Sequence, residues 1–295
     1  MGEYVTGDEA AGEAAFWTCE RGGEPVPHRR GESAPSVENA KVFLENKYIN
    51  DVFRTGVFKD RECVEKTSTK AVWSIGNEFK MASRMYDAAP ETVPEPLLWT
   101  FSGDGKSASV AAERVPGPSL SRILASGGLD GAKADSFAAD VMRLAAALKA
   151  TGIVHRDLFE DNLLLGADGH LKAIDWQLAI DRNDYREDPW VVRNWKFRYV
   201  VFGVNREMGL GVWNDFAALG NILAKFPQTE AVSAARAALA SEADSMAFSA
   251  PPDALTRLKL RMYAVSLRLQ MLLKGRGHRK YAQLERRWRT ALQRW

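Results

Sequence analysis

"IVHRDLFEDNLLLGADGHLKAIDW", residues 153–176, holds several polar residues between apolar runs. The triplet His155-Arg156-Asp157 stands five residues before Asn162, and Asp175 follows two short apolar runs that flank Gly-Ala-Asp-Gly. Such runs around a glycine-containing turn predict a β-hairpin. Buried polar side chains cost free energy unless they bind a partner. We therefore expect the loop before the hairpin and the residue at its end to contribute to one site.

Strand-like and helical patterns divide the rest of the chain around this segment. From about residue 48 to 115 two hairpins are predicted, with turns at Lys59-Asp60 and at residues 103–105. One helix is expected between them, over 75–88, with Phe79, Met81 and Met85 on its apolar side. After a compositional break at 115–120 the pattern is mainly helical. The expected helices run from a cap at Asp135 to Gly152, from Asn214, over 229–245 and over 253–273.

The predicted fold class is therefore α+β, with a small antiparallel-sheet lobe before a larger helical lobe. The expected divisions are a loose leader (1–40), an N-lobe (41–115), a C-lobe (116–252), and a C-terminal helix with a basic tail (253–295). The leader is expected because residues 1–40 are rich in Gly, Glu, Ala and Pro, with Phe16 and Trp17 as candidate anchors.

Composition excludes several classes of protein. The 295 residues are 46% hydrophobic and carry a formal net charge of +2, so overall charge names no partner. Two isolated cysteines, Cys19 and Cys63, do not make a disulfide framework and favour a reducing compartment. The N-terminal residues lack a basic-then-apolar signal pattern, and no apolar run approaches the ~18 residues of a spanning helix. We expect a cytoplasmic protein, with contact to the inner membrane face left open.

The order of these motifs resembles the protein-kinase-like superfamily over roughly residues 48–225, which implies a bilobal fold that uses ATP and Mg²⁺. The resemblance implies that Asp157 is the catalytic residue, which orients an acceptor hydroxyl and takes its proton. It also implies that Asn162 and Asp175 hold the metal ions beside the nucleotide, since hard oxygen ligands suit Mg²⁺. Taken singly, each residue could instead serve a turn or cap.

Further residues take family roles by the same resemblance. Lys66 on a strand would grip the nucleotide phosphates, with Lys59 and Lys70 as alternatives, and Glu78 on the helix would hold the lysine. Backbone groups of the hinge would meet adenine; the hinge residues are Glu113, Arg114 and Val115. Asp215 in "NDFAALGNIL" would brace the catalytic loop, or simply favour its helix dipole.

The chain also departs from the family pattern. Only Gly56 stands where a glycine-rich loop is expected, and Gln177 follows Asp175-Trp176 in place of the usual glycine. Ala-Pro-Glu is missing before Asp215, and Phe159 stands where protein serine/threonine kinases carry lysine. These departures make the chain look more like divergent bacterial kinases of the lipopolysaccharide core sugar kinase type.

Two basic regions bear on the acceptor. Arginines and aromatic residues alternate between Asp175 and Asp215, a mixture that suits phosphate groups and sugar rings. The tail 274–295 is basic and contains Trp288 and Trp295, which fits an anionic membrane surface. Nucleic acid is the other anionic partner and is disfavoured. Each region is equally typical of a solvated segment.

The sequence thus predicts transfer of the ATP γ-phosphate to a hydroxyl, on a sugar of a membrane-associated glycolipid such as lipopolysaccharide core. One alternative is a divergent bacterial protein serine/threonine kinase. A second alternative is a pseudokinase that acts as a binding module, which loss of the glycine-rich loop would favour.

Overall fold

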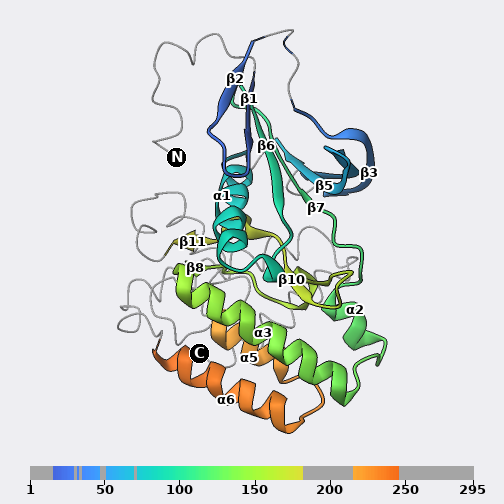
Figure 1. Ribbon diagram of the computed structural model, residues 1–295, viewed down its shortest axis with the longest axis vertical. Coiled ribbons are helices and arrows are strands. Elements are labelled where there is room, and N and C mark those ends of the chain that lie inside the picture. The colour runs from blue at the N-terminus through green and yellow to red at the C-terminus, as the bar shows by residue number, and fades with distance from the viewer. Residues whose placement is uncertain are drawn as a thin grey trace, which may run out of the picture.

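A computed structural model describes residues 16–29, 32, 35–46, 51–69, 72–181 and 215–245 of the chain. A β-sheet formed by residues 16–113 lies above a group of helices formed by the later part of the chain (Figure 1). The expected α+β order, with an antiparallel sheet before helices, is confirmed. The boundaries of the lobes at 41–115 and 116–252 remain predictions.

The sheet has seven antiparallel strands in the order β2-β1-β6-β7-β5-β4-β3. The strands are β1 (Phe16–Glu20), β2 (Val26–His28), β3 (Glu38–Asn46), β4 (Asp51–Phe58), β5 (Arg61–Ser68), β6 (Pro96–Ser102) and β7 (Ala108–Glu113). Both predicted hairpins are present. Lys59 and Asp60 have φ of 48° and 63°, the left-handed values that a tight two-residue hairpin turn requires.

The leader predicted over residues 1–40 is wrong for part of its length. Strands β1 and β2 extend the sheet beyond β6, and β3 already begins at Glu38. Trp17 lies opposite Phe101 on β6, while Cys19 packs with Ile75 and Val110 in the core. The physical reason is that β6 would otherwise be an open sheet edge, which a short strand can pair and cover.

Helix α1 (Val72–Ala88) packs against both the sheet and the helical part of the molecule. Phe79 packs in the cluster beneath the sheet, whereas Met81 and Met85 belong to the core of the helical part. The predicted apolar residues are therefore all buried, but on two sides of the helix. This double packing sets the position of α1 between the sheet and the helices, as Figure 1 shows.

The helical part contains α2 (Leu120–Ala125), α3 (Gly131–Thr151), α5 (Asp215–Leu223) and α6 (Glu230–Ser245). Short strands β8 (Ile153–Val154), β9 (Leu163–Leu165), β10 (Leu171–Ala173) and β11 (Ile180–Asp181) lie between α3 and α5, together with 3-10 turns at Glu160–Asn162 and Trp176–Leu178. A further 3-10 turn, Pro90–Thr92, follows α1. The predicted hairpin is β9–β10.

The start of α3 corrects a prediction. Asp130, not Asp135, is the N-cap, and its carboxylate accepts a hydrogen bond from the Lys133 N–H at 2.8 Å. Asp135 lies one turn further on, because a carboxylate at 130 satisfies an otherwise unpaired amide and lets the helix begin earlier. The predicted end is confirmed, with Gly152 in the left-handed region at φ 69°.

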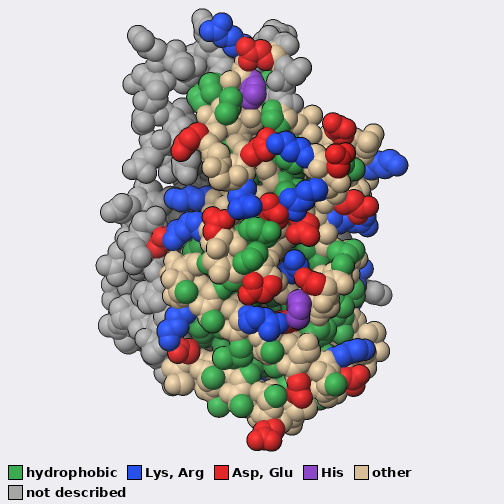
Figure 2. Space-filling view, viewed as in Figure 1, with side chains coloured by type: hydrophobic (Ala, Val, Ile, Leu, Met, Phe, Trp, Pro, Cys, Tyr) green, Lys and Arg blue, Asp and Glu red, His purple; other side chains and the backbone are tan. Residues whose placement is uncertain are grey.

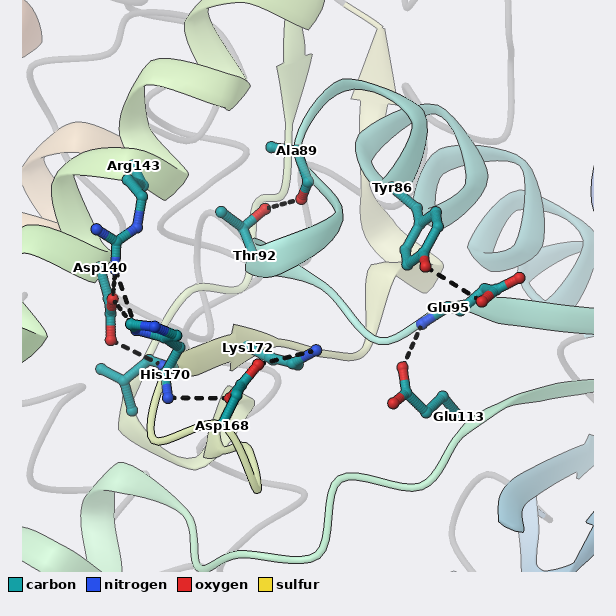
Figure 3. A network of polar contacts seen from close by, with 11 residues as sticks. Tyr86, Ala89, Thr92, Glu95, Glu113, Asp140, Arg143, Asp168, His170 and Lys172 are labelled. Atoms are coloured by element: carbon teal, nitrogen blue, oxygen red, sulfur yellow. Dashed lines mark hydrogen bonds and ion pairs between the residues drawn. The ribbon is translucent and has the colours of Figure 1, made fainter. Parts of the chain in front are cut away.

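Helix α3 is tied to the β9–β10 hairpin by a buried carboxylate. Asp140 accepts the backbone N–H of Leu171 at 2.9 Å and lies 3.0 Å from Nδ1 of His170, and Arg143 contacts the same carboxylate (Figure 3). Gly117 meets the other side of the hairpin, since a Cβ there would lie 2.2 Å from the Leu165 carbonyl oxygen. These contacts fix the position of the β9–β10 hairpin, which lies within the segment 153–176.

Charged side chains of both signs are interleaved over the face in Figure 2. Arg21 and Arg61, for example, both pair with Glu95, at 3.1 and 2.8 Å. Such surface pairs contribute little stability individually. No helix among the described residues is long and apolar enough to cross a bilayer. The predicted helix 253–273, the tail 274–295 and the Arg/aromatic segment before Asp215 lie outside the described residues.

Candidate functional site

Lys66 is the residue on which distant parts of the chain converge. Its Nζ donates hydrogen bonds to Glu78 Oε2 at 2.9 Å, Asp175 Oδ1 at 2.9 Å and Gln177 Oε1 at 3.1 Å. Strand β5 supplies the lysine, α1 the glutamate, and the turn after β10 the other two. Of the three candidate lysines, Lys59 instead pairs with Glu20 at an exposed position. Lys70 lies outside the described residues.

Burial and charge act against each other on Lys66. Burial lowers its pKa, but the carboxylates of Asp175 and Glu78 outweigh this and raise the pKa above its ordinary value. For Glu78, burial raises the pKa to about 7, although Lys66 draws it down. The lysine therefore stays charged at physiological pH between the two acids.

The backbone before Asp157 is held by a buried acid from α5. Asp215 accepts the N–H of His155 at 2.5 Å and the N–H of Arg156 at 3.1 Å, as the sequence predicted for it. Burial raises the pKa of Asp215 to about 7, although these two amides favour the ionised form. Arg156 is held at φ 69°, a conformation that costs an L-residue free energy and persists only where contacts enforce it.

Replacement of Asp215 by Asn should therefore destabilise the protein. The Asn amide would turn its NH₂ group toward one of the two backbone N–H groups, which leaves that buried N–H unpaired at a cost of about 1–3 kcal/mol. Thermal or urea unfolding would measure the loss. Asp87→Asn is the control, because Asp87 is exposed and pairs only with Arg21 among the contacts of the described residues. Equal stability of the two variants would contradict the bracing role.

Asn162 and Asp175 stand on adjoining chain segments. The Ile174 N–H donates to the Asn162 carbonyl at 3.0 Å, so the residue before Asp175 is bound to the end of the loop. Nδ2 of Asn162 donates to the Asp157 carbonyl at 2.9 Å. Asp175 has φ 67°, and next to it Trp176 packs edge-on against His155 at 4.4 Å between ring centres. The loop and the turn are thus coupled through both backbone and side chains.

The donor set of this site fits Mg²⁺. The amide nitrogen of Asn162 is already engaged, which leaves its oxygen for a cation, and Asp175 offers a carboxylate. Hard oxygen ligands are those that Mg²⁺ prefers, and it commonly completes its shell with water and nucleotide phosphates. The described residues contain no group of three or more His, Cys, Asp or Glu able to hold a metal by themselves.

The hinge leaves one backbone donor available. The N–H of Glu113 donates to the Glu95 carbonyl at 2.8 Å, and that of Arg114 to the Glu62 carbonyl at 3.0 Å. The Val115 N–H has no hydrogen-bond partner among the described residues. Figure 3 shows the Glu113 carboxylate accepting from the backbone of Glu95, whose own carboxylate accepts from Tyr86. Val115 therefore follows a strand end that hydrogen bonds hold in place, and its own N–H is without a partner among the described residues.

Sequence reasoning missed two residues of the site. Asn77, beside Glu78, donates from Nδ2 to the carbonyls of Gln177 at 3.1 Å and Ala179 at 2.8 Å. Gln177 was noted only as a missing glycine, yet its side chain binds Lys66. Only the partners of both side chains, 100 or more residues away along the chain, show their importance.

Known proteins similar to this chain agree with the kinase-like resemblance. No family model matches the chain. The chain is 24% identical over 170 residues to "Rho-associated protein kinase 1" of Homo sapiens and of Oryctolagus cuniculus, covering 52% of this chain and 12% of each relative. It is 36% identical over 84 residues to "Serine/threonine-protein kinase sid2" of Schizosaccharomyces pombe, covering 28% of this chain and 14% of that relative.

The chain thus has a distant similarity to serine/threonine protein kinases and spans only a small part of their length. This supports the protein-kinase-like resemblance, the use of ATP and Mg²⁺ in general terms, and a kinase-like phosphotransferase. It lends no support to the lipopolysaccharide core kinase type or to a membrane role. The protein-kinase alternative is therefore better supported than the glycolipid reading that the sequence favoured.

Proposed function

We propose that this chain is an ATP- and Mg²⁺-dependent phosphotransferase that moves the γ-phosphate to a hydroxyl group. The meeting of Lys66, Glu78 and Asp175 at 2.9 Å contacts, beside a loop braced by Asp215, carries the proposal. A binding module that takes no nucleotide would not need a buried lysine held between two acids. The distant similarity to protein kinases is an independent support.

Each residue has a distinct proposed role. Lys66, positioned by Glu78, binds nucleotide phosphate oxygens, and the backbone of Glu113 and Val115 meets the adenine. Asn162 and Asp175 hold Mg²⁺, which when bound neutralises charge on the phosphates. Asp157 accepts the proton of the acceptor hydroxyl. The hydroxyl oxygen then forms a bond to the γ-phosphorus as the bond to the bridging β,γ oxygen breaks, and ADP leaves.

The acceptor that the comparisons favour is a serine or threonine hydroxyl of a protein. A sugar hydroxyl is the second candidate, because Phe159 stands two residues after Asp157 where protein kinases carry a lysine. Phe159 has extended backbone at the start of the 3-10 turn Glu160–Asn162. An aromatic side chain there removes a cation from the acceptor side and offers a face for a sugar ring.

Labelled ATP with separate acceptor pools tests the proposal. We expect Mg²⁺-dependent transfer of label to the protein itself or to a generic basic protein substrate. Label in a glycolipid or small-sugar pool, with none in protein, would reverse the order of the two acceptors. Nucleotide binding without transfer to any pool, or no binding at all, would contradict the enzyme and favour a binding module. Contact of residues 274–295 with a membrane stays a prediction. The expectation that nucleic acid is not a partner also stays a prediction.

A further inference from the structure

Gln177 places a neutral amide directly against the ammonium of Lys66. The Lys66 side chain carries only N–H donors, so the amide atom that it contacts at 3.1 Å is the oxygen, Oε1. The amide nitrogen then lies 3.5 Å from Asp175 Oδ2, where it faces an acceptor. Both ends of the amide are therefore matched to their neighbours.

Lys66 has three N–H groups and three protein acceptors. Glu78, Asp175 and Gln177 take one each. The Lys66 side chain is only 6% exposed, which leaves little room for water to replace any of them. A buried donor without a partner costs free energy. Gln177 thus supplies the third acceptor of Lys66, which a glycine side chain at this position could not provide.

Of the three acceptors, Gln177 is the one that a phosphate can displace most easily. Glu78 and Asp175 are carboxylates at 2.9 Å, whereas Gln177 is neutral and more distant, at 3.1 Å. All three bonds have a charged donor, but only the two carboxylates add the attraction of an opposite charge. Asn77 holds the backbone carbonyl of Gln177, so the side chain can leave while the turn stays in place.

We propose that Gln177 is a positioning residue that occupies the place of a phosphate oxygen on Lys66 and competes with the nucleotide for it. The inference rests on the proposed function, because it assumes that Lys66 binds nucleotide phosphates. Gln177 holds the Lys66 ammonium in place through its 3.1 Å contact, and its release is part of the cost of nucleotide binding. It affects phosphate affinity rather than the transfer step.

Two substitutions should change affinity in opposite directions. Gln177→Ala removes the competitor, so ADP should bind a few-fold tighter, and the rise in melting temperature on ADP binding should be larger than in the wild type. Gln177→Glu puts a charged acceptor on Lys66, so ADP should bind roughly tenfold more weakly. Binding is measured by calorimetry with ADP in EDTA, which removes any metal contribution of a new carboxylate.

Gln228→Ala is the matched control for lost hydrogen bonds. Nε2 of Gln228 donates to the carbonyls of Leu223 and Phe226 between α5 and α6, away from Lys66. It should lower the melting temperature equally with and without ADP. Gln177 does not compete with the nucleotide if Gln177→Ala lowers the melting temperature equally with and without ADP, or if it weakens ADP binding. The same conclusion follows if Gln177→Glu binds ADP as tightly as the wild type. If the wild-type protein binds no nucleotide even with Mg²⁺, the proposed function fails first, and this inference falls with it.

Discussion

Asp157→Asn should reduce turnover by at least ~10²-fold, the usual contribution of a general base, while the melting temperature stays close to that of the wild type. Asn has the shape of Asp but cannot accept the hydroxyl proton. The bond from Asn162 Nδ2 goes to the backbone carbonyl of Asp157, so it survives the change. Asp157 is only 4% exposed, and loss of a buried charge does not require the loop to move.

The measurement is steady-state transfer from ATP to the acceptor identified in the pool experiment, with unfolding followed in parallel. Asp161→Asn is the control in the same loop, because Asp161 is exposed and contacts Ser121 rather than the site. Near-normal turnover for Asp157→Asn would show that another group accepts the proton. A large fall in melting temperature would show that Asp157 has a structural role instead.

Local sequence signals predicted the parts of the fold that depend on short-range chemistry. The helix end at Gly152 is set by a residue that tolerates left-handed backbone, and the turn at Lys59-Asp60 follows from the strand-like runs on either side of it; both occur as expected. The apolar runs on either side of residues 166–169 predicted the hairpin, and the family resemblance implied the brace from Asp215; the structure shows both. In each case the decisive contact is local, or belongs to a motif with fixed order.

The remaining features depend on tertiary contacts that composition does not encode. Strand β1 looks like a loose segment by itself and becomes a strand because β6 offers it an edge. Asp130 and Asp135 are equally good cap residues by type, and packing of the helix decides between them. Asp51 reads as a polar residue at a strand start, yet it is 1% exposed beside the Lys66 cluster, and burial raises its pKa.

The last prediction concerns the metal. In the wild type, ATP should raise the melting temperature more with Mg²⁺ than without it, because ligand bound only to the native state stabilises that state. At a hundredfold excess over Kd, bound ligand contributes about 2.7 kcal/mol. Asp175→Asn should remove most of the additional rise in melting temperature that Mg²⁺ gives, since an amide is a weaker ligand for a hard divalent cation than a carboxylate.

Nucleotide binding without metal should respond to Asp175→Asn in the opposite way. The Asp175 carboxylate pairs with Lys66 at 2.9 Å, and loss of its charge makes the ammonium easier for a phosphate to bind. Metal-free ADP should therefore bind Asp175→Asn at least as well as the wild type. Asp168→Asn is the control, because Asp168 lies in the turn of the same hairpin and interacts with Lys172 there, as Figure 3 shows. If Asp175→Asn lost metal-free and Mg²⁺-dependent binding to the same extent, the carboxylate would be shaping the site rather than binding the ion. If it lost neither, the metal ligand would have to be another residue.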